Sequence, residues 1–422
     1  MHIEIPDKVG FILSKLEEAG FEAYAVGGCI RDSILGREPE DWDITTSALP
    51  KDIKACFKRT VDTGIEHGTV TVLLGNDSFE VTTYRIDGEY RDLRHPAEVS
   101  FTNRVAEDLR RRDFTINAMA YNPATGLLDL FDGRKDLEAG IIRCVGIPDE
   151  RFSEDALRIL RAVRFAAQLG FEIEPGTAKA IRGHAANLKA VSRERILTEI
   201  TKLICSAHIE RIEDLFKLGL APYIAGDFGS IDIGQLKELK ACAALIKDGA
   251  VPDAFRLDRA AGLSARYLRF AFLTEGMKTD AVKRMLKELK SDNDTLNKCI
   301  TLQRMVFKPI PSDRYLLKKE MSGMSPELFK DLLWLKEASR NTGLYAACSK
   351  EEDLDEAVRL HEDILIKQEP VYLKDLSVTG ADLKAAGIAE GPEIGRQLKD
   401  FLDMVHRDPY MNTKEKLMGS LR

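Results

Sequence analysis

The stretch Val26-Gly27-Gly28-Cys29-Ile30-Arg31-Asp32, followed closely by Asp41-Trp42-Asp43, decides the fold of this chain. Residues 21–26 have the composition of a short β-strand, and two glycines follow them. Glycine lets the backbone turn sharply and approach a ligand closely, because it carries no side chain. We predict a helix from Arg31 onward, and exposed amides at a helix start can bind a phosphate. The stretch therefore predicts a strand, a phosphate-sized turn and a helix.

Two acidic residues follow this turn. We predict a second strand over residues 41–45, which contains both Asp41 and Asp43. Side chains two residues apart share one face of a strand, with α-carbons roughly 7 Å apart. Both carboxylates can then reach the same pair of divalent ions, and two ions about 4 Å apart can clamp the attacking and leaving oxygens of an in-line displacement. Either half alone is also typical of a glycine turn beside a solvent-facing acidic strand end. Their order and proximity favour metal-assisted nucleotidyl transfer.

The composition limits where this chemistry takes place. At 422 residues the chain is long enough for two or more domains. Its seven cysteines lack paired spacing, which argues against a disulfide framework or a zinc site and favours a reducing cytoplasm. The start of the chain lacks a signal-peptide pattern, and we find no apolar run long enough to span a membrane. A net charge of −7 argues against indiscriminate coating of nucleic acid.

The sequence pattern changes near residue 145. Before it, residues 68–74 and 78–86 alternate in the manner of β-strands around Gly75-Asn76-Asp77, a strong hairpin signal. After it, nearly every segment has helical periodicity. We therefore predict an α+β fold, with an N-terminal head of mixed sheet and helices and an all-helical remainder. The helices predicted in the remainder include residues 154–169, 193–205, 280–289, 326–338 and 354–366.

An arginine cluster at residues 110–112 precedes the sequence Phe114-Thr115-Ile116-Asn117-Ala118-Met119. We predict that the three arginines begin an apolar helix and lie at the level of a triphosphate. The planar guanidinium fork matches phosphate oxygens. The alternative is a solvated charge run at a helix start, although arginines there oppose the helix dipole.

Residues 154–165 carry charge at every third position from Asp155. Three residues on a helix advance by about 300°, so Asp155 and Arg158 are predicted neighbours on a winding ridge. A carboxylate only accepts hydrogen bonds and a guanidinium only donates them, so the pair complements the amino group and adjacent ring nitrogen shared by cytosine and adenine. Arg164 falls about 180° from Asp155, where we expect it to touch phosphate or a structural acid. The alternative is a helix with salt bridges along its surface.

Five motifs, in order, resemble those of class II tRNA nucleotidyltransferases, which belong to the poly(A) polymerase family within the DNA polymerase β superfamily. The resemblance implies template-independent addition of C, C and A to the 3′ end of tRNA from CTP and ATP, with release of pyrophosphate. It further implies a polymerase-β-like nucleotidyltransferase head, or catalytic palm, at residues 1–145, a helical neck at 146–205, a helical body at 206–310 and a helical tail at 311–422. The motifs are residues 27–43, 111–118, 128–133, 154–165 and 192–196.

The resemblance also implies roles for individual residues. Asp41 and Asp43 would be the catalytic residues and would hold Mg²⁺. Gly28 and Arg31 would contact the phosphate and sugar side of the nucleotide, and Arg112 would bind the incoming nucleotide. Asp155 and Arg158 would read the base, and the last two arginines would complete the pocket. The full nucleotide-binding set is Gly28, Arg31, Arg112, Asp155, Arg158, Arg161 and Arg164.

Related enzymes add CCA, CC or A, or make poly(A), on nearly the same motifs. Residues 87–96 resemble the flexible loop of complete CCA-adding enzymes, which favours CCA addition; a polar hairpin tip is the alternative interpretation. A CC-adding or A-adding enzyme, a poly(A) polymerase and a catalytically silent RNA-binding homologue remain alternatives. An aminoglycoside-type nucleotidyltransferase would leave the helical half without a purpose.

Two further features bear on the partners. Glu80, on a predicted strand over residues 79–83, is a third acidic position near the metals, with a surface acid as its rival interpretation. Residues 382–388 and 391–396 resemble the family's tail, where a glycine-rich turn leads into a helix that meets tRNA away from its 3′ end; an ordinary helix-to-helix turn is the alternative interpretation. We expect tRNA to be bound at its 3′ end and its elbow, mainly by shape and backbone. We expect no membrane and no required protein partner.

Overall fold

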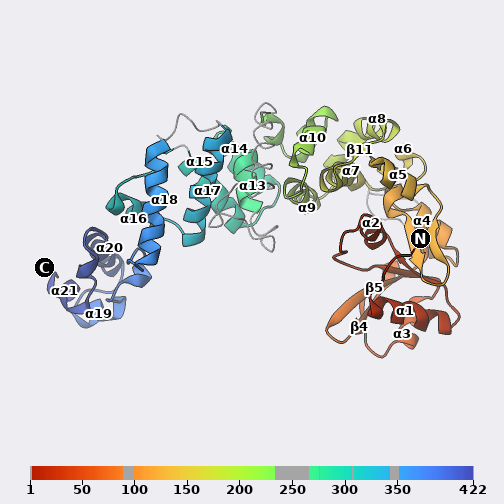
Figure 1. The fold of residues 1–422 in the computed structure, drawn as a ribbon, viewed down its shortest axis with the longest axis horizontal. Helices are drawn as coiled ribbons and strands as arrows, with labels where there is room; N and C mark the ends of the chain where they lie inside the picture. Colours follow the sequence, from red (N-terminus) through yellow and green to blue (C-terminus); the bar gives the residue numbers. More distant parts are fainter. Residues whose placement is uncertain are drawn as a thin grey trace. The chain divides into compact units, whose positions relative to one another are not determined.

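A computed structural model describes residues 2–88, 99–232, 266–274, 276–306, 308–342 and 351–421 of the chain. The chain forms two compact units, one of Met1–Ile233 with Arg284–Ser291 and one of Gly234–Lys283 with Asp292–Arg422. The first unit holds the large sheet and the helices that follow it, and the second unit is helical (Figure 1). The expected α+β fold is confirmed. The division into head, neck, body and tail at the boundaries given above stays a prediction.

The head is built on a seven-stranded mixed sheet. Its strands are β1 (Ala23–Val26), β2 (Ile44–Thr46), β3 (Thr60–Gly64), β4 (Thr69–Leu74), β5 (Asp77–Thr83), β8 (Met119–Asn122) and β9 (Gly126–Asp129). They lie in the order β3-β4-β5-β2-β1-β8-β9. Strand β1 pairs antiparallel with β2 and β8, whereas β2 runs parallel to β5. The helices of the head are α1 (Asp7–Glu18), α2 (Gly28–Ile34), α3 (Pro50–Cys56), α4 (Val105–Arg110) and α5 (Gly133–Ala139).

The predicted strand, turn and helix around Gly27 are present, with shifted boundaries. Helix α2 begins at Gly28, three residues earlier than predicted, because Gly27 turns the chain with a φ of 85°. Strand β2 begins only at Ile44, so the acidic pair precedes it instead of lying within it. The amide of Val26 still donates to the carbonyl of Asp43 at 3.0 Å, which keeps Asp43 beside β1.

The predicted hairpin is confirmed. Strands β4 and β5 pair antiparallel from Thr69 opposite Thr82 to Leu74 opposite Asp77, and Gly75 turns with a φ of 67°. The strand predicted to reach residue 86 ends at Thr83, and a short strand β6 (Arg85–Asp87) pairs with β7 (Val99–Phe101). Most of the predicted loop at residues 87–96 lies outside the described residues.

The predicted apolar helix after the arginine cluster is wrong. Arg110 ends α4, Thr115–Asn117 form a single 3₁₀ turn and Met119 begins β8. Cations at a helix C-terminus are favourable, which removes the conflict with the helix dipole. All four residues of β8 are buried, and β8 lies between β1 and β9. Periodicity does not separate such a short, buried and mostly apolar segment from a helix.

The helix predicted over residues 154–169 is broken near its start. Helix α6 (Pro148–Glu154) ends before Asp155, whose backbone is extended, and α7 (Leu157–Leu169) begins two residues later. The carboxylate of Asp155 accepts a hydrogen bond from the amide of Leu157 at 3.0 Å. This local turn competes with the helix, as aspartate side chains commonly do. The prediction that Asp155 and the arginines lie along one helix is therefore wrong.

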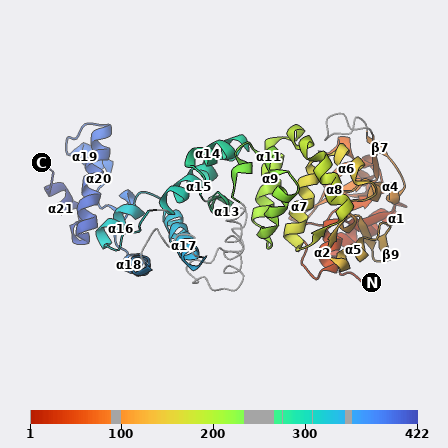
Figure 2. The same ribbon diagram turned by 90° about the horizontal axis from the view of Figure 1, so that it is seen from above.

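Helix α7 is the central helix of those that follow the head. It packs along α9 (Arg193–Ile204), the helix predicted at 193–205, while α6 packs along α8 (Pro175–His184) (Figure 2). Eleven of the thirteen residues of α7 are buried, because the helix has neighbours on several sides. Short strands β10 (Ile141–Ile142) and β11 (Glu172–Ile173) pair parallel, and helices α10 (Glu213–Lys217) and α11 (Ala221–Ile224) follow.

The remaining part of the chain is helical, and the predicted helices at 280–289, 326–338 and 354–366 are present. A separate apolar core forms near the C-terminus around Leu383, Phe401 and Val405. Gly391 has a φ of 127° and leads into a helix, as predicted for the tail turn. Among the described residues, no helix is long and apolar enough to cross a bilayer. The helices are α13 (Arg266–Leu273), α14 (Thr279–Glu288), α15 (Asn293–Val306), α16 (Arg314–Met321), α17 (Pro326–Thr342), α18 (Glu351–Ile366), α19 (Gly380–Ala385), α20 (Pro392–Arg407) and α21 (Lys414–Gly419).

Candidate active site

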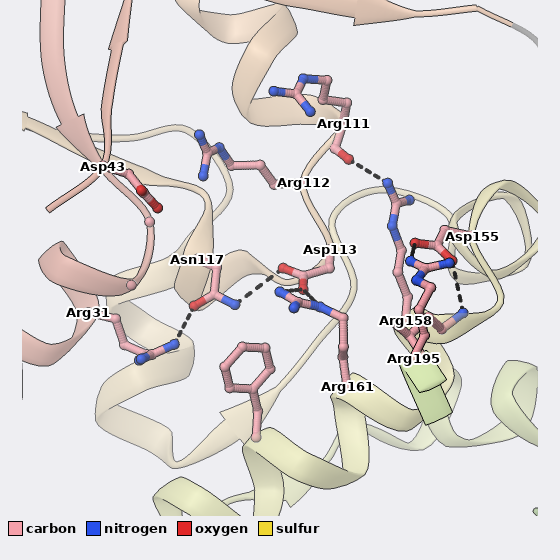
Figure 3. A pocket seen from close by; sticks show the side chains of 14 residues that line it. Arg31, Asp43, Arg111, Arg112, Asp113, Asn117, Asp155, Arg158, Arg161 and Arg195 are labelled. Atoms are coloured by element: carbon pink, nitrogen blue, oxygen red, sulfur yellow. Dashed lines mark hydrogen bonds and ion pairs between the residues drawn. The ribbon is translucent and has the colours of Figure 1, made fainter. Parts of the chain in front are cut away.

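Most of the predicted site residues line one cavity of about 460 Å³ in the first unit (Figure 3). Asp41 lines a neighbouring cavity of about 420 Å³, and both cavities share Gly28, Arg31 and Asp43. Arg164 lines neither of the two. The predicted residues that line the first cavity are Gly28, Arg31, Asp43, Arg112, Asp155, Arg158 and Arg161.

Three carboxylates gather at the acidic end of this site. Asp41 and Asp43 are exposed just before β2, and Glu80 lies on β5. Because Ile44 pairs with Val81 in the parallel register, Asp43 and Glu80 stand at corresponding positions of the two neighbouring segments. Withdrawal from water raises the pKa of Asp43, the charge of Arg112 lowers it and the charge of Asp41 raises it. Partial burial and then the charges of Asp43 and Asp41 raise the pKa of Glu80.

These carboxylates fit a divalent cation. Their mutual repulsion is relieved when a cation lies among them. In the part of the chain that the structure describes, no group of three or more acidic, histidine or cysteine side chains is placed to hold a metal ion by itself. Mg²⁺ commonly keeps several waters and takes one or two carboxylates together with substrate phosphates. The acid set therefore fits a metal whose coordination is completed by a nucleoside triphosphate.

The arginine cluster provides the cationic wall of the cavity. Asp108, which is fully buried, accepts hydrogen bonds from Arg111 at 2.8 Å and from Arg112 at 3.3 Å. Burial works against its charge, but the two guanidiniums outweigh that cost and hold the pKa of Asp108 below its usual value. A Cβ on Gly27 would lie 3.0 Å from Nη1 of Arg112, so the glycine leaves room for this arginine. Arg112 extends toward Asp43 (Figure 3).

A chain of hydrogen bonds crosses the floor of the cavity. Arg31 of α2 donates to Asn117 at 2.7 Å, Asn117 donates to Asp113 at 3.2 Å, and Arg161 of α7 donates to Asp113 at 2.7 Å (Figure 3). Burial disfavours the charge of Asp113, but Arg161 and then Asn117 lower its pKa to about 2. The chain therefore links an arginine of the head to an arginine of the helix that follows it.

At the other end of the cavity, Asp155 and Arg158 each have a partner of their own. Asp155 forms an ion pair with Arg195 of α9 at 2.8 Å. Arg158 forms an ion pair with Glu154 at 2.5 Å and donates to the carbonyl of Arg111 at 3.0 Å. The acceptor and the donor predicted for base reading thus both face the cavity, although they do not share one helix.

Arg164 is buried behind the cavity on a structural acid. Its guanidinium lies 3.2 Å from Glu199 of α9. Burial is the largest influence and lowers the pKa of Arg164 to about 10, partly opposed by Glu199. The expectation that Arg164 points away from Asp155, toward a structural acid, agrees with this placement.

The turn at residues 128–133 supports the arginine wall from behind. The carboxylate of Asp129 accepts hydrogen bonds from the amides of Gly133 and Arg134, both at 2.8 Å. A Cβ on Gly133 would lie 2.3 Å from the carbonyl oxygen of Thr115. Glycine is therefore required where this turn meets the loop that follows the arginines.

Four polar or aromatic lining residues received no role from sequence reasoning: Asp113, Asn117, Phe165 and Arg195. All four stand inside the motifs quoted above, and that position was the signal that could have found them. Spacing along the chain did not identify them, because they lie on separate elements that only the fold brings together. For Glu80, the parallel register with β2 provides the missing signal.

The sheet, the paired acids and the arginine wall define a nucleotidyltransferase. Consistent with this, residues 23–143 match the poly A polymerase head domain. Residues 170–227 match the "probable RNA and SrmB-binding site of polymerase A", and residues 264–421 match tRNA nucleotidyltransferase domain 2.

Whole-chain comparisons narrow the class to one family. The CCA-adding enzyme of Levilactobacillus brevis is 38% identical over 97% of this chain and 96% of its own length. That of Streptococcus suis is also 38% identical, over 96% of this chain and 94% of its own length. The crystal structure of the Bacillus stearothermophilus CCA-adding enzyme in complex with CTP matches with a TM-score of 0.72 and 30% identity, covering 99% of this chain and 98% of that one.

The chain therefore belongs to the family of CCA-adding enzymes. It is a tRNA nucleotidyltransferase, and the predicted activity, addition of CCA to tRNA, is confirmed. Enzymes of this family use a divalent metal. The roles assigned above to individual residues stay predictions.

Proposed function

We propose that one cavity of this enzyme performs all three additions, C, C and A, from CTP and ATP. The observation that supports this is the meeting of Asp43 of the head with Asp155 and Arg158 of the following helices around about 460 Å³. Small-molecule sites typically enclose about 300 to 1,000 Å³, so a single nucleotide fits. The acids lie at one end for the reacting phosphate, and the acceptor and donor lie at the other for the base.

In this proposal, Asp41 and Asp43 hold Mg²⁺, with Glu80 as a third carboxylate beside them. An ion held there would supply Lewis-acid chemistry, which would activate the 3′ hydroxyl of tRNA and stabilise the charge on the leaving pyrophosphate. The 3′ oxygen bonds to the α-phosphorus while the bond from that phosphorus to the bridging oxygen of the β-phosphate breaks. The carboxylates position the reactants, and catalysis comes mainly from positioning and electrostatics.

The cationic residues bind the triphosphate. Gly28 lies at the start of α2, where free amides face a phosphate, and Arg31 lies on the same helix. Arg112 is held over Gly27 by Asp108 and can bind an incoming phosphate with its free donors. Arg161 completes the wall of the pocket, and Arg164 completes it from behind.

Asp155 and Arg158 select the base. The carboxylate accepts a hydrogen bond from the exocyclic amino group of cytosine or adenine, and the guanidinium donates one to the adjacent ring nitrogen. Uracil and guanine present a carbonyl where the amino group would be, so an acceptor would face the carboxylate and the base contact would be lost. A good bidentate base contact is worth about 1 to 3 kcal/mol, enough for about 5- to 150-fold discrimination.

The helical parts bind the tRNA. The match of residues 170–227 to a probable RNA-binding site supports RNA binding beside the neck. The turn at Gly391, before α20, would bind a backbone phosphate at the elbow. We place the reaction in the cytoplasm, because the five cysteines described by the structure are all free thiols.

One incubation tests this function. The enzyme is mixed with Mg²⁺, a tRNA lacking its 3′ end and each labelled nucleotide, and the products are sized and sequenced. Addition of CCA supports the proposal, whereas two cytidines indicate a CC-adding enzyme and a long A ladder indicates a poly(A) polymerase. The Asp41→Ala and Asp43→Ala variants should bind tRNA without extending it, and extension by both variants would contradict the assigned metal ligands.

A further inference from the structure

Phe165 has no role in the reaction described so far, yet three arginines surround its ring. The guanidinium carbons of Arg31, Arg161 and Arg164 lie 5.1, 5.2 and 4.1 Å from the ring centroid. Significant cation–π contacts occur about once per 70 to 80 residues in proteins, so three on one ring need an explanation. The ring is only 5% exposed, but it still lines the nucleotide cavity.

The three cations are held apart by different acids. Arg31 pairs with Asp32 of its own helix at 2.7 Å. Asp113, in the loop after α4, pairs with Arg161 at 2.6 Å, and Glu199 of α9 pairs with Arg164 at 3.2 Å. These acids come from three separate elements. The ring of Phe165 is therefore the group that all three arginines share.

The ring also provides a second connection between the head and α7. On one side, Arg31 and Arg161 are joined through Asn117 and Asp113 by hydrogen bonds of 2.7, 3.2 and 2.7 Å. On the other side, both guanidiniums rest on Phe165. The separation of the two arginines is thus fixed from two directions. Hydrogen bonds to Asp32 and Asn117 orient Arg31 and those to Asp113 orient Arg161, and the aromatic face adds an electrostatic restraint that both guanidiniums share.

Taking the proposed roles of Arg31 and Arg161 as the basis, we propose that Phe165 is a positioning residue for the nucleoside triphosphate. The negative face of its ring holds an arginine of the head and an arginine of the neck as one preformed pair. Preformed donors bind a ligand more tightly, because less side-chain freedom is lost on binding. Neither arginine is assigned to base reading, so Phe165 supports CTP and ATP equally.

The competing interpretation is a core phenylalanine that only fills space. Phe165 does pack against Phe114, edge to face, with ring centroids 5.8 Å apart. A space-filling ring depends on its volume and shape. A positioning ring depends in addition on the charge distribution of its face, which fluorine substitution weakens with little change of size.

The test replaces Phe165 in the full-length enzyme by phenylalanines carrying one, two or three fluorines. KM and kcat are measured for CTP on tRNA that ends before the two cytidines and for ATP on tRNA that ends after them. The thermal unfolding midpoint is recorded for each protein. Phe152 provides the matched control, since it is fully buried in α6 against His184. The same fluorinated residues are introduced there.

We expect KM for both nucleotides to rise together with each added fluorine at position 165, reaching roughly tenfold for three. We expect kcat to stay within about twofold, and the control series to leave KM unchanged. The proposal is overturned if KM stays constant across the series or rises for only one nucleotide. A rise in KM that follows a falling thermal unfolding midpoint also overturns it. These results leave CCA addition by the unmodified enzyme intact, so they are distinct from a failure of the proposed function, in which that enzyme adds no CCA.

Discussion

Asp155 and Arg195 form a 2.8 Å ion pair between the turn that precedes α7 and the helix α9. The second carboxylate oxygen of Asp155 accepts the amide of Leu157 at 3.0 Å. The carboxylate assigned to base reading is thus fixed from two sides by the neck. Its orientation depends on a residue from a different helix.

Removing the contact between Arg195 of α9 and Asp155 should make base selection less strict. We expect Arg195→Ala to lower the preference for C and A over U and G by roughly tenfold, because a freely rotating carboxylate loses its directional match to the base edge. The measurement is the ratio of kcat/KM values for the four nucleotides. Lys202→Ala, on the same helix, is the control. Unchanged selectivity in Arg195→Ala would contradict the role given to this ion pair.

Gly27 should be needed for two separable reasons. Its φ of 85° strains any other residue, and a Cβ there would press on Arg112. Gly126 is a matched control, because its φ is 80° and no atom lies within 4 Å of a Cβ built on it. We expect both alanine variants to lose about 1 kcal/mol of unfolding free energy, measured by urea denaturation. Only Gly27→Ala should also raise KM for CTP and ATP, by about tenfold; equal KM values in both variants would refute the contact with Arg112.

Glu80 should influence the metal requirement. The charges of Asp43 and Asp41 contribute to the raised pKa of Glu80, so its own charge contributes to the field that attracts a cation. We expect Glu80→Gln to raise the Mg²⁺ concentration needed for half-maximal activity by roughly three- to tenfold. Asp77→Asn, at the far end of the same strand, controls for the loss of a surface charge. A Mg²⁺ titration identical to that of the wild type would show that Glu80 is only a surface acid.

The ion pair of Asp113 and Arg161 should contribute to acid sensitivity. The pKa of Asp113 is lowered in the folded protein, from 3.8 to about 2, so its stabilisation is present above pH 4 and is lost as the pH falls toward 2. We expect Asp113→Asn to be less stable than the wild type by roughly 1 to 3 kcal/mol at pH 6. This difference should shrink as the pH is lowered below 4, measured by chemical denaturation. A gap of constant size across that range would exclude the charge of Asp113 as its cause.

The sequence was most informative where local rules act alone. The turn at Gly27, the hairpin at Gly75 and most of the helices predicted after residue 145 follow from glycine conformation and periodicity, and the structure has them. The acidic pair was identified with the site for the same reason, because Asp41 and Asp43 lie close to the turn along the chain. Their strand was placed too early, since β2 begins only at Ile44.

The errors arise where tertiary contacts override a local pattern. Residues 114–119 read as a helix because they are mostly apolar, but they form a 3₁₀ turn and the start of β8, and tertiary packing buries all of them. Asp155 read as helical because charge recurs every third residue, but its side chain caps a turn and binds Arg195. The pairing of Arg31 with Asn117 and of Arg161 with Asp113 could not be predicted from spacing along the chain, since only the folded chain brings these residues together.

The central claim is that one cavity holds the reacting phosphate at Asp41 and Asp43 and the base at Asp155 and Arg158. The most direct test is a crystal structure with Mn²⁺ and a non-hydrolysable CTP analogue, in which anomalous scattering locates the metal. We predict Mn²⁺ bound by both aspartates and the triphosphate, with the cytosine amino group on Asp155 and its ring nitrogen on Arg158. A metal bound away from the two aspartates, or a base that faces away from Asp155, would contradict this account.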